Sequence, residues 1–587
     1  MSNQFLNVYN FIPLPKQKAK KYEDSDKHTG YIEYQITTKT PLFIPNTSNE
    51  DYFNIRVNGH KSYDFFSYTN LANDKSGKCH KPVIPGSQMR GMVRSLYETV
   101  TASCMSVLNN KADLSKRVGT PYMPGLLHKV GDKYELYSAT SYGLKGAQGF
   151  KDGDKVYFEK GKGGAKVNKN GRYEGYIYHG EYKPGDKLKT NEFHIYEMNE
   201  FEANFEEEDV CNLLFGSIES YQAQKDGENR YVNYEASFHD FLDGEDENGN
   251  PVEPYFPVNY NRVESDDRNG EDLVYLSCAR ITREVSNYKI KDMVRDFNPC
   301  SNQENICPSC DLFGVVNTDS NLAMTSKLRF ADLEVEDKEN VEDYFMKQVT
   351  LPALSSPKLS NTAFYLKKPA PDAAYWTFDY YVANGKVTTQ STEIQGRKYY
   401  WHFKQPFALG LEPTILNKTI RPLKEGISFT GKVYFDGISN KQLEQLKLIL
   451  SGFDGECSYK LGTGKPFGMG SIDCKVTGIK ERINFKDGHP CFEEENLSLD
   501  TKSYEEVGFN AEVEAPFKLI CDFNACEGLG VSYPQTGDPK AEGFKWYEMD
   551  LGKIKKARYV NYLKPLAKGK TAKDLMLGKD GLGGKSK

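Results

Sequence analysis

The chain has 587 residues, of which 38% are hydrophobic and 27% charged. This composition excludes a largely disordered protein. The length exceeds what one hydrophobic core supports, so we expect two to four domains, or one core with large insertions. The formal net charge of -6 is not that of a free-standing nucleic-acid binder, unless basic residues are locally concentrated or basic partners share the nucleic acid.

The sequence also bears on membranes and on the redox state of the cysteines. No stretch approaches the roughly 20 apolar residues of a membrane span, and the start MSNQFLNVYNF lacks a signal-peptide pattern. We therefore expect a cytoplasmic protein with no membrane partner. In that reducing compartment the twelve cysteines would be thiols or metal ligands rather than disulfides.

The first 110 residues contain the patterns of a strand and of a helix. Apolar and polar residues alternate from Ile32 to Ile36, which predicts a half-buried strand. The segment 80–100, HKPVIPGSQMRGMVRSLYETV, passes from a short apolar strand to helical spacing. We expect a strand-to-helix turn there, with Ser87 as the N-cap.

The next part of the chain, 111–270, changes character. Gly, Lys, Asp and Asn are abundant, and short aromatic segments such as YIYHGEY alternate with turn signals such as KDGD. This pattern predicts a β-rich insertion. The tripeptide LFG occurs at 214–216 and again at 312–314, which leaves open a second, degenerate copy of the core.

The C-terminal half returns to strand and helix patterns. Residues 271–480 contain the strand ISFTGKVYFDG, the helix KQLEQLKLILSG and a glycine loop that enters another strand. The extension 481–587 ends, from about Lys564, in a Lys- and Gly-rich tail that we expect to be disordered.

The order of these elements predicts an α+β fold. Strand and helix, followed by strand, helix and strand, is how a split ferredoxin-like or RRM-like core reads when large insertions interrupt it. Residues 1–110 would supply its N-terminal part and 271–480 a zinc-binding segment with its C-terminal part. The β-rich insertion 111–270 would lie between them.

The strongest local motif is CSNQENICPSCDLFG, which contains Cys300, Cys307 and Cys310. Structural zinc needs four ligands at tetrahedral angles, and a CxxC turn brings two thiolates to one ion. Cys278 is our first choice for the fourth ligand and His80 the second. The alternative is three thiols without a metal; redox catalysis is disfavoured because the context is not a thioredoxin-like strand and helix.

A second motif is IPGSQMRGMVR. Helix N-termini present unpaired N–H groups to phosphates, and Ser87 with its neighbours would allow a close approach. Arg90 and Arg94 are four residues apart, so they share one helix face and would pair with RNA phosphates. The alternative is a capped helix with a solvated arginine face.

A third motif is the glycine loop LGTGKPFGMGSI. Gly462, Gly464, Gly468 and Gly470 leave it short of side-chain bulk, so a backbone or base could lie against it while Lys465 offers charge. It is neither a Walker loop nor a dinucleotide loop. A plain hairpin turn is the alternative.

These motifs appear in a recognisable order. TPLFIP, IPGSQMRGMVR, CPSCDLFG followed by KLRFADLEV, and LGTGKPFGMGSI together resemble the RAMP superfamily of CRISPR-associated proteins, in particular the backbone-type subunits of type III effector complexes. The resemblance covers roughly 31–100 and 271–480. IQGRKYYWH, at 394–402, also resembles a motif of one larger RAMP group.

The resemblance implies an RRM-like core with a zinc-stabilised insertion that cradles guide RNA, through the helix after PGS and through the glycine loop. Target RNA and other effector subunits are the implied partners. In members that cut target RNA, an acidic residue after the first strand supports metal-dependent attack. Asp51, with Glu50 behind it, is the candidate here, with magnesium or manganese; an ordinary loop carboxylate is the alternative.

Two further functions stay open. A stand-alone or guide-processing endoribonuclease would need His or Tyr and Lys beside the glycine loop, and the sequence shows no convincing constellation of this kind. A zinc-stabilised protein-interaction module would suit the acidic balance. In the YYWHF segment, Tyr399 to Trp401 could stack bases and His402 could act as a base. We favour burial of this segment.

Overall fold

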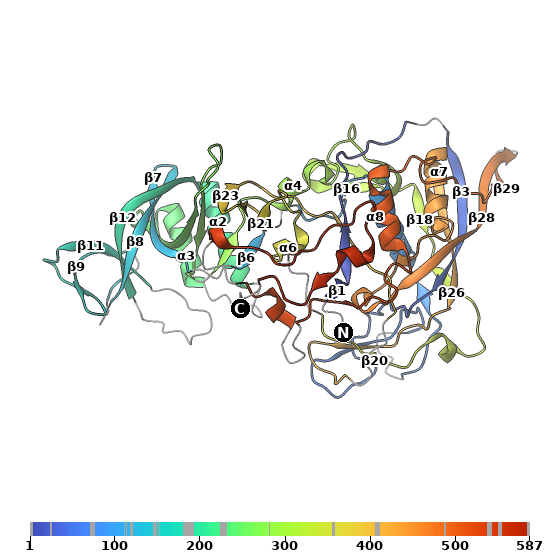
Figure 1. Cartoon of the computed structure of the whole chain (residues 1–587), viewed down its shortest axis with the longest axis horizontal. Coiled ribbons are helices and arrows are strands. Elements are labelled where there is room, and N and C mark those ends of the chain that lie inside the picture. Colours follow the sequence, from blue (N-terminus) through green and yellow to red (C-terminus); the bar gives the residue numbers. More distant parts are fainter. Residues whose placement is uncertain are drawn as a thin grey trace.

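The computed structural model describes residues 4–23, 26–70, 77–110, 112, 114–117, 121–144, 149–151, 153–179, 193–222, 232–280, 282–354, 359–404, 411–486, 489–536, 543–549 and 554–583. Helices and strands are mixed along the chain, and two eight-stranded sheets lie toward opposite ends of the long axis (Figure 1). None of the described helices is long and apolar enough to cross a membrane.

The first sheet is built from segments far apart in the sequence. Its strand order is β27-β28-β3-β26-β19-β5, with β18 also paired to β26 and β29 to β28. The strands are β3 (His28–Thr38), β5 (Val83–Ile84), β18 (Leu328–Phe330), β19 (Leu333–Val335), β26 (Ser428–Ile438), β27 (Tyr459–Lys460), β28 (Ser471–Lys486) and β29 (His489–Asn496). All of their pairings are antiparallel.

Alternation along β3 explains why one face of this sheet is covered. Ile32, Tyr34 and Ile36 are buried, whereas the residues between them are partly exposed. The helices α1 (Gly86–Val100) and α7 (Asn440–Leu450) pack against strands of this sheet and against each other. In chain order the main elements are thus the strand β3, the helix α1, the strands β19 and β26, the helix α7 and the strand β28.

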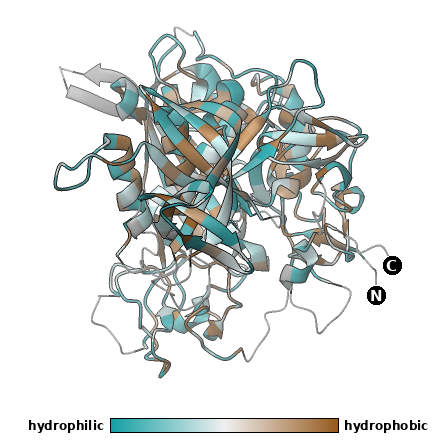
Figure 2. Cartoon of the chain, turned by 90° about the vertical axis from the view of Figure 1, so that its left-hand side faces the viewer, coloured by the Kyte–Doolittle hydropathy of each residue, from teal (hydrophilic) through white to brown (hydrophobic). Residues whose placement is uncertain are grey.

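The β-rich segment that interrupts this order has its own sheet. The strand order is β10-β9-β11-β12-β8-β7-β13-β14. The strands are β7 (Met123–Val130), β8 (Lys133–Gly143), β9 (Lys155–Gly161), β10 (Gly164–Val167), β11 (Tyr173–His179), β12 (Phe193–Glu206), β13 (Tyr255–Val263) and β14 (Leu273–Ser277). Figure 2 looks at this end of the molecule, where hydrophilic and hydrophobic residues alternate along the strands.

Two helices, α2 (Glu207–Gln222) and α3 (Val232–Asp243), accompany the second sheet. Their Leu213 and Phe238 share a buried cluster with Leu127 of β7 and Leu136 of β8. The insertion therefore buries a core of its own, separate from the cluster beneath the first sheet.

The C-terminal segment differs from our expectation. Disorder from about Lys564 is wrong for the described residues up to 583, because Leu566, Leu575 and Leu577 are buried. The strand β31 (Leu577–Gly578) pairs antiparallel with β1 (Gln4–Asn7), and β30 (Val531–Ser532) pairs with β1 on its other side. Leucines spaced among the Lys and Gly residues join the main core, which the composition alone does not reveal.

Shorter elements connect these parts. They are β2 (Tyr9–Ile12), β4 (Lys61–Tyr63), β6 (Ser115–Arg117), β15 (Arg283–Val285), α4 (Ile290–Met293), α5 (Pro308–Phe313), β16 (Val315–Asn317), β17 (Leu322–Met324), β20 (Val349–Thr350), α6 (Thr362–Tyr365), β21 (Ala373–Trp376), β22 (Tyr380–Ala383), β23 (Lys386–Thr389), β24 (Arg397–Tyr400), β25 (Lys418–Ile420) and α8 (Ala511–Cys521). Of these, β24, α5 and α8 border the two sites described next.

Candidate functional site: a cysteine cluster and a lysine-lined pocket

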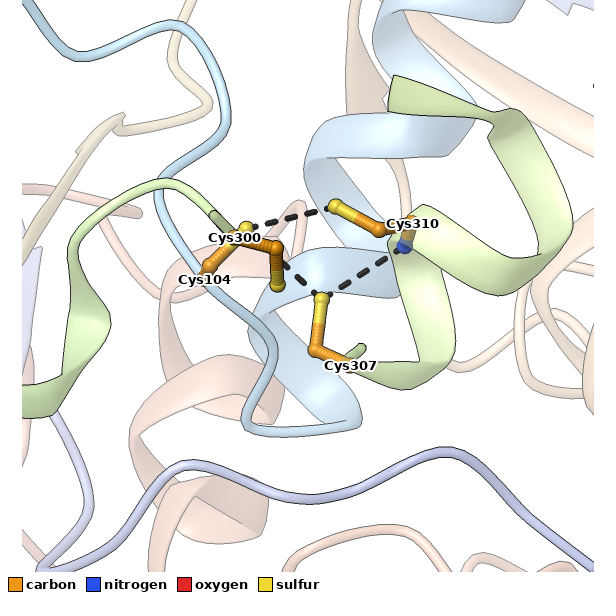
Figure 3. Close-up of side chains that lie close together, drawn as sticks. All are labelled: Cys104, Cys300, Cys307 and Cys310. Atoms are coloured by element: carbon orange, nitrogen blue, oxygen red, sulfur yellow. Dashed lines mark hydrogen bonds between the residues drawn. The ribbon is translucent and has the colours of Figure 1, made fainter. Parts of the chain in front are cut away.

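Four buried cysteines face one another beyond the C-terminal end of α1. They are Cys104, Cys300, Cys307 and Cys310, and each is at most 1% exposed. Figure 3 shows their sulfur atoms directed toward one another from α5, the loop before it and the chain after α1. Cys307 is the N-cap of α5 and its sulfur accepts a hydrogen bond from the N–H of Cys310.

The spacing of the four sulfurs suits one tetrahedral metal ion. All four lie within 4.8 Å of one another, and Cys104 Sγ is 3.5 Å from Cys310 Sγ and 3.6 Å from Cys307 Sγ. A tetrahedron with zinc–sulfur bonds of about 2.3 Å has edges of about 3.8 Å. The donor set therefore fits a metal ion such as zinc.

The fourth cysteine is not the one we predicted. Cys278 lies in a different cluster, where its sulfur is 3.5 Å from Ser217 Oγ, and His80 contacts the Thr69 hydroxyl. Cys278 directly follows β14 of the insertion sheet, so nearness in sequence to Cys300 misled the prediction. Cys104, 196 positions before Cys300, is brought in by α1.

A pocket of about 360 Å³ opens beside the N-terminal half of α1. Its walls come from α1, β24, β27 with the glycine loop, and α8. The lining residues are Ser87, Gln88, Gly91, Met92, Ser95, Leu96, Lys398, Tyr399, Tyr400, His402, Ser458, Tyr459, Lys460, Leu461, Gly462, Lys465, Ile520 and Cys521. The helix after PGS and the glycine loop thus border one cavity, together with the YYWHF segment.

One face of α1 lines this pocket, but it is not the arginine face. Ser87, Gly91 and Ser95 recur every four residues and border the cavity. Arg90 instead donates to the Phe313 carbonyl at 2.6 Å, and Arg94 pairs with Glu98 at 3.0 Å. The prediction that the arginines converge with the glycine loop is therefore wrong, because a 3.6-residue period turns them away from it.

The start of α1 is also capped differently from our prediction. The N-cap is Pro85, which has no side-chain cap, so Ser87 is the second helical residue. Asp332 accepts a hydrogen bond of 2.7 Å from the N–H of Gly86. A carboxylate at this end of the helix is favourable to its dipole, and it leaves the Ser87 side chain available to the pocket.

Three lysines supply the charge of the pocket. Lys460 Nζ donates to the carbonyls of Gly468 and Met469 at 3.0 and 3.1 Å, and Lys398 Nζ lies 3.8 Å from the ring centroid of Tyr9. Lys465 is half-buried, and within the described part of the chain its ammonium has no hydrogen-bond or carboxylate partner. Burial lowers the pKa of Lys460 to about 7 and that of Lys398 to about 8, and it also lowers the pKa of Lys465.

The charge of these lysines is not balanced within the pocket. Among the described residues that line it there is no Asp or Glu. Lys465 further lowers the pKa of Lys460 by repulsion. Buried charges are normally paired, so the pocket is a favourable place for an anion.

The four glycines of the loop are explained by the packing of the loop against the rest of the protein, not by an open groove. Each has a positive φ, between 72° and 79°. A Cβ atom would clash with the Phe43 carbonyl at Gly462, with Met469 at Gly464, with the Phe403 carbonyl at Gly468 and with the Leu461 carbonyl at Gly470. Gly462 and Lys465 line the pocket, whereas Gly464, Gly468 and Gly470 face the protein's own chain.

The YYWHF segment is partly buried, as we favoured. Trp401 is fully buried and His402 is 2% exposed. His402 Nδ1 lies 3.0 Å from Ser471 Oγ, and burial, with the repulsion of Lys460, holds the pKa of His402 well below its usual range. Tyr399 and Tyr400 are nevertheless partly exposed and line the pocket.

The candidate catalytic carboxylate lies apart from both sites. Asp51 pairs with Ser62 in an isolated bridge, and Glu50 forms an ion pair of 2.7 Å with Lys61. In the part of the chain that the structure describes, the cysteine cluster is the one group of three or more potential metal ligands found, and Asp51 is not in it. A magnesium or manganese site at Asp51 stays a prediction.

The two sites are connected through the residue before Lys398. Arg397 contacts Glu98 at 3.2 Å and the Cys104 carbonyl at 3.1 Å, and it also donates to the Ser103 carbonyl. Lys398 follows it directly and lines the pocket. Arg397 thus joins the segment after α1 that carries Cys104 to the strand that carries Lys398.

Comparisons with known proteins do not assign the chain to a family. No protein-family model and no curated protein matches the chain. Among solved structures it is similar to a chain of the type III-B Cmr-beta complex bound to cognate target RNA, at 8% identity and a TM-score of 0.19, over 77% of this chain and 98% of that one. It is similar to Csc2 of Thermofilum pendens at 10% identity and a TM-score of 0.14, over 62% and 68%. Such TM-scores are too low to assign a fold.

Sequence reasoning missed Cys104, Lys398 and Lys460. Cys104 stands alone in TASCMS without a motif. Lys398 lies inside IQGRKYYWH, where the aromatic residues drew attention first. Lys460 was detectable only as the charged position that immediately precedes the glycine loop, in SYKLGTG.

Proposed function

We propose that the chain binds RNA through the lysine-lined pocket, as a subunit of a type III-like CRISPR effector complex that contacts guide RNA and its target duplex. The observation that carries the proposal is the set of three lysines in a cavity that has no acidic residue among its described lining. Lysine ammonium groups bind phosphate as point charges. The local concentration of positive charge also reconciles RNA binding with a net charge of -6.

The order of strands supports an RRM-like core within this proposal. The neighbouring strands in the sheet are β28, β3, β26 and β19, in that order. In chain order these are the fourth, first, third and second strands of a βαββαβ unit, which is the strand arrangement of an RRM-like fold. The helices α1 and α7 follow the first and third of these strands. The motifs of the RAMP resemblance fall on the segment after β3, α1, α5, β18 to β19 and the glycine loop, which all border or support this unit.

We assign zinc to the cysteine cluster as part of the same proposal. Four thiolates leave no open coordination position, which is typical of structural rather than catalytic zinc. Its role would be to hold α5 and the preceding loop against the end of α1. Elemental analysis of purified protein, with about one zinc per chain as the expected result, tests the assignment.

One observation favours a guide-processing endoribonuclease as the second candidate. His402, Tyr399 and Lys460 all line the pocket beside the glycine loop, which is the constellation that this function needs. His402, however, is neutral and held by Ser471. The protein and its Lys460→Gln variant can each be incubated with a repeat RNA in the presence of EDTA. Metal-independent cleavage of the RNA that Lys460→Gln abolishes would establish the endoribonuclease.

The RNA-binding proposal is tested by a salt titration. Lys465→Gln should weaken binding of single-stranded RNA about tenfold and reduce the slope of log K against log salt by about 0.7, the value for one phosphate contact on a single strand. Arg90→Gln is the matched control, because Arg90 faces away from the pocket. An equal loss in both variants, or in neither, contradicts the proposal.

A further inference from the structure

The pocket has two chemically different walls. Lys398, Lys460 and Lys465 come from β24, β27 and the glycine loop, whereas Met92 and Leu96 of α1 are joined by apolar residues of α8. A phosphate group alone would need only the lysines. A volume of about 360 Å³ falls within the range of about 300 to 1,000 Å³ that is usual for small-molecule sites. The cavity is thus large enough, and apolar enough, for a base as well as a phosphate.

The charge of the pocket distinguishes two kinds of phosphate. An internal phosphodiester carries one negative charge, whereas a phosphate monoester carries about 1.5 to 2 near pH 7. Three lysines line the cavity without a described carboxylate among its lining. Lys460 Nζ also donates to two backbone carbonyls, and Lys398 Nζ to the Tyr365 hydroxyl. The ammonium of Lys465 is without any partner in the described chain. A dianion balances this charge better than a single diester does.

We propose that the pocket takes the terminal nucleotide of an RNA chain, with its phosphate monoester on the three lysines and its base against the apolar side chains of α1 and α8. This inference rests on the RNA-binding function proposed above and names the part of the RNA that the site selects.

The lowered pKa values of the lysines agree with this geometry. Burial places the pKa of Lys460 at about 7, so this amine is partly neutral in the free protein. A dianion in the pocket would raise that pKa, and binding would take up a proton. At neutral pH the proton uptake should therefore be larger for a dianion than for a monoanion.

Binding of four forms of one RNA sequence tests the inference. The forms carry a 5′-phosphate, a 3′-phosphate, hydroxyls at both ends, or no ends because the RNA is circular. Fluorescence anisotropy should show one of the two phosphorylated forms binding at least tenfold more tightly than the hydroxyl and circular forms. Lys465→Gln and Lys398→Gln should each reduce that preference, and thermal melts should show that both variants fold.

The control is Lys432→Gln, since Lys432 is paired at 2.8 Å with Glu33 on the sheet and does not line the pocket; it should keep the preference. Equal affinity for all four forms would overturn the inference. If Lys465→Gln still weakened every form in that case, the RNA-binding function would survive. A free nucleoside 5′-monophosphate that competes as well as the phosphorylated RNA would also overturn the chain-end assignment.

Discussion

The cysteine cluster and the lysine-lined pocket lie along the same helix, yet they satisfy their polar groups in opposite ways. At the C-terminal end of α1 four buried sulfurs face one another, so a single ion would complete the site. Along the N-terminal half three lysines line a cavity without a described acidic lining residue. We therefore expect changes at the cysteine cluster to lower the stability of the fold, and changes at the pocket to lower RNA affinity.

The largest effect is expected from Cys104→Ser. It removes one of four ligands, and because metal binding is coupled to folding, the variant should lose its zinc and melt more than about 5 °C lower. Elemental analysis and thermal unfolding measure both quantities. Cys278→Ser, which changes a buried cysteine outside the cluster, should keep about one zinc per chain; loss of zinc in Cys278→Ser would contradict the assignment of the fourth ligand.

A second large effect is expected in the glycine loop. Gly470→Ala places a Cβ against the Leu461 carbonyl at a φ of 78°, whereas Gly455→Ala has a similar φ of 84° and open space. Gly455→Ala is the control, and it should lower the free energy of unfolding only by the strain of a positive φ, about 1 kcal/mol. Gly470→Ala should lower it by at least about 3 kcal/mol. Similar thermal shifts in the two variants would mean that the loop is not packed as described.

A rise in pH should lower the affinity for RNA and raise the contribution of Lys460 and Lys398 to the stability of the fold. As the pH rises through 7 and 8, Lys460 and Lys398 lose their charge, so RNA affinity should fall severalfold between pH 6.5 and pH 9. The same lysines have pKa values near 10.4 when unfolded. The unfolded chain therefore binds more protons between about pH 7 and pH 10, and these two groups favour folding more as the pH rises.

The check on this prediction is Lys460→Met, measured by anisotropy over the same pH range. Its affinity should vary less with pH than that of the natural chain. An unchanged pH profile in the variant would show that another group controls binding.

The smallest effect is expected from Arg94→Gln. Arg94 pairs with the buried Glu98, which keeps Arg397 as a partner in the variant. The variant should therefore lose about 1 to 2 kcal/mol of stability and leave RNA affinity unchanged. A loss of RNA affinity as large as that of Lys465→Gln would restore the arginine face as the RNA contact and remove the distinction between the two faces of α1.

How far the sequence could predict these sites depends on whether a signal is local. The strand at Ile32 to Ile36, the helix after Pro85 and the CxxC turn are local patterns, and the structure has the strand and the helix and places Cys300, Cys307 and Cys310 together. Short alternating segments of 111–270 such as YIYHGEY also overlap strands of the insertion sheet, whereas α2, α3 and the inclusion of β14 in that sheet were not predicted.

Long-range partners had no local signal. Cys104 reaches the cluster because α1 packs against α5, and Lys398 lies in a strand whose Tyr399 is hydrogen-bonded to α1. The direction of Arg90 depends on the Phe313 carbonyl and ring. The glycines had a local signal that was read incompletely, since a positive φ and close packing against Phe43 and Phe403 explain them without an RNA. Local patterns thus predicted the elements better than they predicted the role of each residue.

Photocrosslinking of bound RNA, with the attached peptides identified by mass spectrometry, tests the central claim most directly. RNA in the pocket should crosslink to Tyr399 and Tyr400 and to the α1 segment that carries Met92, and Lys465→Gln should reduce these crosslinks. Crosslinks confined to the open face of the first sheet, for example at the partly exposed Tyr434, or to the insertion would contradict it.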